Sequence, residues 1–168
     1  MPMKQITGFP PIENPDARLL ILGSMPGVES LRKNQYYAHP RNAFWPIMGE
    51  LFGAAPALPY QARTEILKSS GIAVWDVLAS CHRPGSLDAD ISATRANDFA
   101  SFFQFHPHIE QLCFNGATAE KLFLRQVMLK PCGMRLVRLP SSSPAHAAMS
   151  YPDKVAQWRD RIQIKRPG

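Results

Sequence analysis

The sequence predicts an α/β domain of three layers, in which helices cover both faces of a central, mostly parallel four-stranded sheet. Four short segments are rich in branched apolar residues, as strands buried on both faces are. Helical patterns separate these segments, and this alternation is typical of a parallel sheet covered on both sides. With 168 residues, of which 45% are hydrophobic, the chain suits one domain, which we expect to span residues 1–168.

Each predicted strand is a short apolar run bounded by turn residues. The strands are expected at residues 17–23, 71–78, 109–116 and 134–140. The helices are expected at residues 43–52, 60–70, 92–105 and 117–129, with a last helix after Ser150. In the first helix, apolar side chains recur at spacings of three and four residues, as in an amphipathic helix. The last helix begins with a serine, a proline and Asp153, an arrangement typical of a capping box.

The composition favours an acidic partner. The formal charge is +6, with 19 Lys and Arg residues against 13 Asp and Glu residues. Such a surface binds a polyanion favourably, because binding releases the counterions of the polyanion into solution. There is neither an apolar run of about 18 residues nor a signal segment, so we expect a cytoplasmic protein without a membrane partner. Cys81, Cys113 and Cys132 lack CxxC spacing, so we expect reduced thiols and no metal site or iron–sulfur cluster.

Small and polar residues gather where the predicted strands end. GSMPG (23–27) follows the first strand, Asp76 lies near the end of the second, FNG (114–116) ends the third and LPSSSPAHA (139–147) follows the fourth. QYYAHPRNAFW (35–45) comes soon after GSMPG. Ligands of open parallel sheets bind beyond the carboxyl ends of the strands, because loops and helix N-termini meet there. We therefore expect the functional site at this edge of the sheet.

For several of these residues, an ordinary structural role explains the pattern as well as a functional role does. GSMPG is either a tight turn or a phosphate-binding loop, although it lacks the lysine of a Walker A loop. Ser141, Ser142 and Ser143 form a simple polar loop or place hydroxyl and N–H groups on a phosphate. Asn42 precedes a helix, so its side chain either caps that helix or points into the crevice. Asn115 is either a turn residue before a glycine or part of the site.

Tyr37 and Asp76 are the most unusual residues of the pattern. Tyr37 lies on the loop side of its motif and is better placed than the neighbouring aromatic residues to lie under a flat ligand. His39 fits a hydrogen-bonded loop residue better than a catalyst. Asp76 interrupts the apolar run GIAVWDVL, and a buried carboxyl must be hydrogen-bonded, paired or protonated. The basic residues after the second strand are expected in a solvated loop: His82, Arg83 and Arg95.

Two motifs, one after the first predicted strand and one after the last, resemble those of a known family. GSMPG followed by QYYAHPRNAFW is similar to the GxxPG and (F/Y)AHPxNxFW motifs of mismatch-specific uracil glycosylases, and LPSSSPAH stands in the place of an H/N-P-S loop. With GIAVWDVL and FNG between them, the chain resembles the uracil-DNA glycosylase superfamily over most of its length. Within that superfamily it is most similar to the hypoxanthine-DNA (deoxyinosine) glycosylase group. The resemblance implies a monofunctional DNA N-glycosylase for DNA repair, which flips out a deaminated base and hydrolyses its N-glycosidic bond.

The resemblance also implies roles for individual residues. Asn42 takes the position of the residue that orients the attacking water, with Asn115 in support. The residues expected at the base are Gly23, Ser24, Tyr37 and Asp76. Asp76 either accepts from N1–H of hypoxanthine or acts as the general base for the water. The residues expected on the DNA are Ser141, Ser142, Ser143 and His146, with Ala145 and His146 near the wedge that fills the vacated stack. Hypoxanthine is the first expected base, and uracil in mismatches is the second. The expected partner is DNA that contains a deaminated base. We expect no cofactor and no metal, and we expect the protein to be a monomer.

Two positions depart from the family pattern. Met25 stands where the mismatch-specific uracil enzymes have an asparagine that positions water, and Ser141 stands where related enzymes have histidine or asparagine. Because a thioether cannot orient water, the alternative function is a non-catalytic DNA-binding module that keeps the fold. A third alternative is a flavodoxin-like or nucleotide-binding protein, which predicts a co-purifying cofactor and indifference to DNA.

Overall fold

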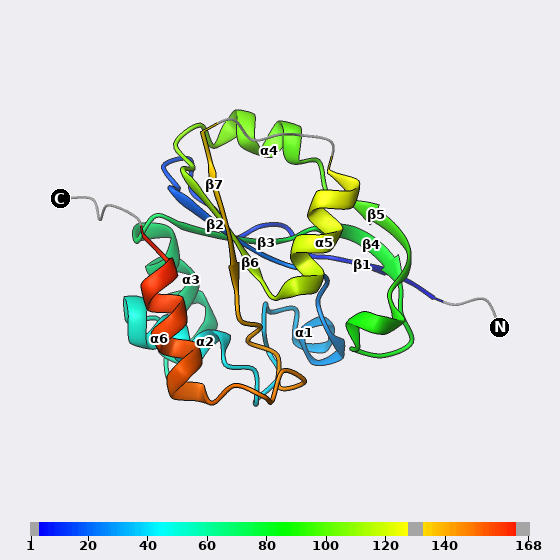
Figure 1. Ribbon diagram of the computed structural model, residues 1–168, viewed down its shortest axis with the longest axis horizontal. Coiled ribbons are helices and arrows are strands. Elements are labelled where there is room, and N and C mark those ends of the chain that lie inside the picture. The colour runs from blue at the N-terminus through cyan, green and yellow to red at the C-terminus, as the bar shows by residue number, and fades with distance from the viewer. Residues whose placement is uncertain (1–3, 128–132, 164–168) are drawn as a thin grey trace.

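The computed structural model describes residues 4–127 and 133–163 (Figure 1). Its central sheet has the strand order β3-β2-β6-β7, and every pairing in it is parallel. The strands are β2 (Leu19–Gly23), β3 (Ile72–Asp76), β6 (Gln111–Asn115) and β7 (Arg135–Leu139). They lie inside the four predicted segments, so the prediction of an α/β domain with a parallel four-stranded sheet is confirmed.

The strand β2 has an apolar environment on both of its faces. All of its residues are buried. Leu19 and Ile21 belong to one apolar cluster, whereas Leu20 and Leu22 belong to another. Successive side chains of a strand point to opposite faces of the sheet, so the two clusters are two cores. This double burial explains why the strands have continuous apolar sequences rather than alternating ones.

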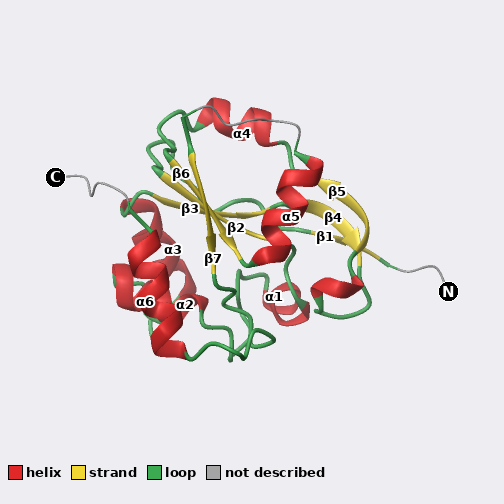
Figure 2. Cartoon of the chain, viewed as in Figure 1, coloured by secondary structure: helices red, strands yellow, loops and turns green. Residues whose placement is uncertain are grey.

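The helices divide between the two faces of the sheet (Figure 2). On one face pack α2 (Phe44–Phe52), α3 (Tyr60–Ser69) and α6 (Tyr151–Arg161). On the other face pack α4 (Phe99–Phe105) and α5 (Ala117–Gln126). The predicted arrangement of three layers is therefore present.

The helix α6 begins as the sequence predicts. Ser150 is its N-cap, and the Ser150 hydroxyl accepts a hydrogen bond from the N–H of Asp153 at 3.3 Å. The Trp158 side chain is fully buried and donates its indole N–H to the carbonyl of Pro140 at 2.8 Å. That bond attaches α6 to the first residues of the loop that follows β7.

A second, antiparallel sheet, which the sequence patterns did not indicate, lies beside the first. Its strands, in the order β1-β4-β5, are β1 (Gln5–Thr7), β4 (Leu78–His82) and β5 (Ser92–Ala96). The prediction of one helix over residues 92–105 is therefore wrong in its first half, because residues 92–96 pair with β4. The helix begins only after Asp98, whose carboxylate accepts from the N–H of Ser101 at 3.1 Å.

The prediction of a solvated basic loop after the second strand is also wrong. The Arg83 side chain is 1% exposed, and its guanidinium donates to the carbonyl of Pro26. His82 ends β4, and Arg95 lies in β5. The short helix α1 (Val28–Lys33), which the sequence patterns did not indicate, follows the GSMPG turn.

The remaining predictions concern thiols, the end of a helix and the membrane. Cys81 and Cys113 are buried free thiols, and Cys132 lies outside the described residues. The helix predicted over residues 117–129 ends at Gln126, and residues 128 and 129 lie outside the described ranges. None of the described helices is long and apolar enough to cross a bilayer.

Candidate active site

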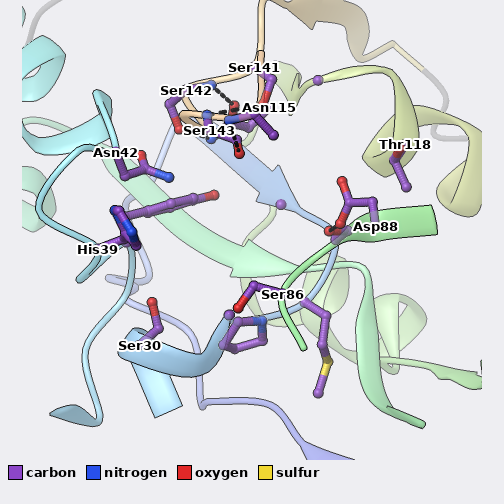
Figure 3. A pocket seen from close by; sticks show the side chains of 18 of the residues that line it. Ser30, His39, Asn42, Ser86, Asp88, Asn115, Thr118, Ser141, Ser142 and Ser143 are labelled. Carbon is purple, nitrogen blue, oxygen red and sulfur yellow. Dashed lines mark hydrogen bonds between the residues drawn. The ribbon is translucent and has the colours of Figure 1, made fainter. Parts of the chain in front are cut away.

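A cavity of about 480 Å³ lies at the carboxyl ends of the parallel strands, which is the lower edge of the sheet in Figure 1. All of the candidate residues from the sequence line this main cavity (Figure 3). They are Gly23, Ser24, Tyr37, Asn42, Asp76, Asn115, Ser141, Ser142, Ser143 and His146. The sequence motifs that lie far apart in the chain thus meet in one place, as parallel strands require.

Asp76 and Tyr37 meet over Gly23 at the bottom of the main cavity. Gly23 and Asp76 are register partners on β2 and β3. A Cβ atom on Gly23 would lie 2.6 Å from Oδ1 of Asp76 and 2.7 Å from the Tyr37 hydroxyl. Carbon does not approach oxygen this closely without displacement, so the absence of a side chain at this position lets the two polar groups converge.

Tyr37 is held in an unusual conformation. Its φ of 54° lies in the left-handed region, which is uncommon for a residue other than glycine and frequent at functional sites. Its ring stacks on Phe44, with centroids 4.1 Å apart and planes inclined by 26°. The hydroxyl is buried and has no hydrogen-bond partner. Burial raises the pKa of this hydroxyl, the Asp76 carboxylate raises it further, and the nearby Asn115 amide opposes both effects only in part, so the group stays protonated and able to donate.

Asp76 also has an unsatisfied oxygen. The residue is 4% exposed, and its Oδ2 atom has no hydrogen-bond partner. Burial raises the pKa of the Asp76 carboxyl to about 7, Arg83 opposes this effect, and Asp88 adds to it. Near neutral pH the carboxyl is therefore present in both protonation states, and its neutral form can donate and accept at once.

A loop that the sequence analysis did not include forms one side of the main cavity. Ser24 donates its hydroxyl to Oδ1 of Asp88 at 2.7 Å. The hydroxyl of Ser86 accepts from the N–H of Val28 at 2.9 Å. Together with Arg83, which reaches the Pro26 carbonyl and lies 3.8 Å from Asp88, these contacts attach the loop of residues 83–88 to the GSMPG turn. The partners are far apart in sequence, 57 positions for Arg83 and Pro26 and 64 for Ser24 and Asp88, so no local pattern indicated these contacts.

Asn42 was expected either to cap the following helix or to point into the crevice, and its side chain does part of each. Its Oδ1 atom accepts a hydrogen bond from the N–H of Phe44 at 2.9 Å, so the side chain satisfies the start of α2, although the N-cap residue itself is Ala43. Only the oxygen of an amide can accept from an N–H group, so the orientation of this amide is determined. In Figure 3 the Asn42 amide nitrogen points into the main cavity.

Asn115 and Ser142 connect the end of β6 to the start of α2. The Asn115 amide donates to the Ser142 hydroxyl at 2.8 Å, and its oxygen accepts from the Ser142 N–H at 2.9 Å. The Ser142 carbonyl in turn accepts from the N–H of Ala43 at 2.9 Å. Ser142 is 1% exposed, so this serine holds the loop in place rather than facing outward.

Ser141 and Ser143 are less enclosed than Ser142. The Ser141 hydroxyl accepts from the N–H of Ser143 at 3.1 Å, and the Ser143 hydroxyl accepts from the N–H of Ala145 at 3.2 Å. Each hydroxyl keeps its own proton for a further acceptor. The exposed His146 donates its N–H to the Ser143 carbonyl at 3.0 Å, so residues 141–146 fold into a compact turn at the mouth of the main cavity.

Two further residues complete the description of the main cavity. The His39 ring accepts from the N–H of Arg41 through Nδ1 at 3.1 Å, the bond expected of a loop histidine. Met25 is 6% exposed and belongs to an apolar cluster. Within residues 4–127 and 133–163, no group of three or more His, Cys, Asp and Glu side chains is placed to hold a metal ion.

Comparisons with known proteins agree with this geometry. The family model of the Uracil DNA glycosylase superfamily matches residues 10–163. A protein of Methanosarcina acetivorans named Hypoxanthine DNA glycosylase is 35% identical over 152 residues, covering 90% of this chain and 94% of the relative. A Methanosarcina barkeri protein of the same name is 36% identical over 157 residues, covering 93% and 97%.

A solved structure is similar as well. The solution NMR structure of a Methanosarcina acetivorans protein superimposes with a TM-score of 0.78 at 33% sequence identity, covering 94% of this chain and 98% of the other. The resemblance that the two sequence motifs indicated is therefore confirmed at the level of the family. The chain belongs to the uracil DNA glycosylase superfamily.

Proposed function

We propose that the protein is a DNA repair glycosylase that flips out a deaminated base, hypoxanthine first, and hydrolyses its N-glycosidic bond to leave an abasic site. The observation that carries this proposal is the pair of buried, unpartnered polar atoms on Tyr37 and Asp76 at the bottom of the main cavity. Unsatisfied buried polar groups are unfavourable, so a ligand that pairs with them gains affinity. The names of the two Methanosarcina relatives support hypoxanthine as the base.

The edge of hypoxanthine matches the neutral form of Asp76. Deamination of adenine leaves an N1–H donor next to an O6 acceptor. A protonated carboxyl accepts from the first and donates to the second, which makes two hydrogen bonds from one side chain. Uracil presents the same pair at N3–H and O4, so the same contact serves uracil as the second substrate. The Tyr37 hydroxyl, beside the same glycine, is a further donor to the base.

The flipped base needs a flat surface as well as edge contacts. Leaving the helix costs a few kcal/mol of pairing and stacking free energy, which aromatic stacking in the site offsets in part. The Tyr37 ring lines the main cavity, and Phe44 supports it from behind. We assign the stacking contact to Tyr37 on this ground.

Hydrolysis requires an oriented water and stabilisation of the departing base. The water oxygen bonds to C1′ while the C1′–N9 bond breaks and its electron pair goes to the base. One water proton stays on the new sugar hydroxyl, the other passes to solvent, and the departing base anion takes up a proton from solvent, so the products are the abasic sugar and the free base. The free N–H₂ group of Asn42 and the second lone pair of its oxygen orient the water, and Asn115 fixes the position of Asn42 through Ser142. The backbone N–H of Ser24, in the GSMPG turn just after β2, stabilises negative charge on the base.

The outer contacts go to the DNA backbone. Ser141 and Ser143 have hydroxyl protons available for phosphate oxygens, and the exposed His146 lies at the rim of the main cavity. Ser142 acts on the DNA only by holding this loop. All of the candidate residues meet in one cavity of a single chain, so the site needs no residue from a second copy. We therefore also propose that the protein acts as a monomer, and that it acts in the cytoplasm.

The test is base release from defined duplexes. The protein is incubated with duplexes that carry hypoxanthine, uracil, xanthine or mismatched thymine, and alkali-labile abasic sites are measured. We expect product from the hypoxanthine duplex and none from an Asn42→Ala variant that still binds DNA. Full activity in that variant contradicts the role of Asn42. A salt-sensitive gel shift without abasic product from any duplex favours the non-catalytic DNA-binding module instead.

A further inference from the structure

A second, smaller cavity lies next to the main one. It has a volume of about 270 Å³ and is formed by the start of α2, the serine loop and the first turns of α6. The two cavities share part of their linings, namely Asn42, Ser142, Ser143, Pro144 and His146. The two cavities therefore adjoin each other at Asn42 and the serine loop.

The charges of the two cavities differ. The smaller cavity is lined by Arg41, His146 and Lys154, and no Asp or Glu is among the described residues that line it. The main cavity, in contrast, includes Glu29, Asp76 and Asp88. Positive side chains without neighbouring carboxylates favour an anionic ligand in the smaller cavity.

Lys154 is the buried one of these basic side chains, whereas Arg41 and His146 are exposed. The residue is 5% exposed, and its ammonium makes one hydrogen bond, to the Ser143 carbonyl at 3.5 Å. No carboxylate of the described residues lies within ion-pair distance of it. An ammonium has three N–H donors and is unfavourable when buried without a partner, and burial lowers the pKa of Lys154 accordingly. The side chain is thus buried against a cavity with donors unused.

We propose that the smaller cavity binds a backbone phosphate of the DNA strand whose flipped nucleotide occupies the main cavity, with the Lys154 ammonium as its principal partner. The proposal rests on the function proposed above and adds a specific phosphate contact to it. A phosphodiester oxygen supplies the negative charge and the acceptors that Lys154 lacks. Arg41 and Tyr151 lie on the same lining and complete a cationic and polar surround.

The first experiment measures the salt dependence of DNA binding. The ligand is a duplex with 2′-fluoro-deoxyinosine, whose glycosidic bond resists cleavage because fluorine disfavours an oxocarbenium-like sugar. Loss of one phosphate contact reduces the slope of log K against log salt by about 0.9. We expect this reduction in Lys154→Gln and a return to the original slope in Lys154→Arg.

The matched control removes a charge from the same helix. Arg159 is exposed on α6 and does not line either cavity. We expect Arg159→Gln to keep the original slope. An unchanged slope in Lys154→Gln, or an equal reduction in both variants, overturns the proposal, because the effect would then be absent or due to net charge alone.

A second measurement does not depend on the stability of any variant. Phosphates near the inosine are replaced one at a time by a neutral methylphosphonate in the duplex. We expect one position at which the replacement weakens binding of the unaltered protein about tenfold and leaves the binding of Lys154→Gln unchanged. The absence of such a position overturns the proposal.

A free phosphate ion has the same chemistry as a backbone phosphate, and inorganic phosphate is the probe that separates them. At constant ionic strength we expect no Lys154-dependent thermal stabilisation by millimolar inorganic phosphate. Such stabilisation together with unchanged DNA binding in Lys154→Gln indicates a site for a free anion and contradicts the proposal. Failure of the proposed function gives a different result. If no duplex releases a base, the difference in salt-dependence slope between the unaltered protein and Lys154→Gln can still be measured and still supports the phosphate contact.

Discussion

Asn115 and Ser142 are joined by two reciprocal hydrogen bonds, from amide to hydroxyl at 2.8 Å and from backbone N–H to amide oxygen at 2.9 Å. The residues are 27 positions apart in the chain. Through the bond from Ala43 to the Ser142 carbonyl, this pair also sets the position of the neighbouring Asn42. In the mechanism proposed above, Asn115 is therefore a positioning residue for the Asn42 amide.

The first prediction concerns this pair. Asn115→Ala leaves the N–H and hydroxyl of the buried Ser142 without partners, which costs about 1–3 kcal/mol of unfolding free energy. We expect base release to slow by about tenfold or more as the loop loosens, in line with the sensitivity of catalysis to small displacements. Denaturant unfolding and single-turnover base release measure the two effects. Asn115→Asp is the control, because its carboxylate still accepts from the Ser142 N–H and accepts from the Ser142 hydroxyl once that hydroxyl turns to donate, so we expect it to keep most of the activity.

The second prediction concerns the pH dependence of stability. Asp76 has a pKa of about 7 in the folded protein, above its ordinary value of 3.8, so the folded state binds this proton more tightly than the unfolded state. The contribution of Asp76 to the unfolding free energy is then greatest at acidic pH and falls as the pH rises from about 4 to about 7, by up to about 4 kcal/mol. Urea unfolding across this range measures the slope. Asp76→Asn removes this contribution, and an unaltered slope in that variant shows that another group is responsible.

The third prediction concerns Gly23. Gly23→Ala places a Cβ 2.6 Å from Oδ1 of Asp76 and 2.7 Å from the Tyr37 hydroxyl, so both side chains must move from their positions at the bottom of the main cavity, where we propose that they bind the base. We expect base release to fall about 100-fold or more while the protein stays folded. The control is Gly85→Ala, because a Cβ at Gly85 meets no atom within 4 Å. Equal activity of the two variants argues against a fixed geometry of Asp76 and Tyr37.

The fourth prediction separates stability from activity at one atom. Tyr37→Phe removes a buried hydroxyl that has no partner, while the stacking on Phe44 is kept. We expect the free protein to become more stable by about 1 kcal/mol, because an unsatisfied polar group is gone. The Michaelis constant for the hypoxanthine duplex rises if the hydroxyl donates to the base. Thermal unfolding and steady-state kinetics give the two numbers, and a loss of stability contradicts the assignment of an unpartnered hydroxyl.

The sequence predicts the elements that depend on local patterns. The apolar runs that became β2, β3, β6 and β7 are long enough to be recognised, and the cap at Ser150 is a local hydrogen bond. The candidate residues at the strand ends meet in one cavity because parallel strands deliver them to the same edge.

The elements that escaped prediction depend on distant partners. Residues 92–96 form a strand because they pair with β4, although their own sequence is compatible with a helix. Arg83 is buried because its guanidinium reaches the Pro26 carbonyl, 57 positions away. Lys154 lies at a cavity because α6 docks near the serine loop. The residues that flank these positions in the sequence do not indicate such contacts.

The passage of the chain from β3 to β4 has a mechanical consequence for the site. Within a single residue, Val77, the chain leaves the parallel sheet and joins the antiparallel one. The Val77 N–H donates to the Gly23 carbonyl at 2.8 Å, and its carbonyl accepts from the N–H of Asn97 at 2.9 Å. Solvent reaches the Val77 amide only when the two sheets separate there, so we expect this amide to exchange its hydrogen as slowly as the amides of the core. The bottom of the cavity is thus anchored on two sides, and adaptation to DNA is left to the loops at its mouth.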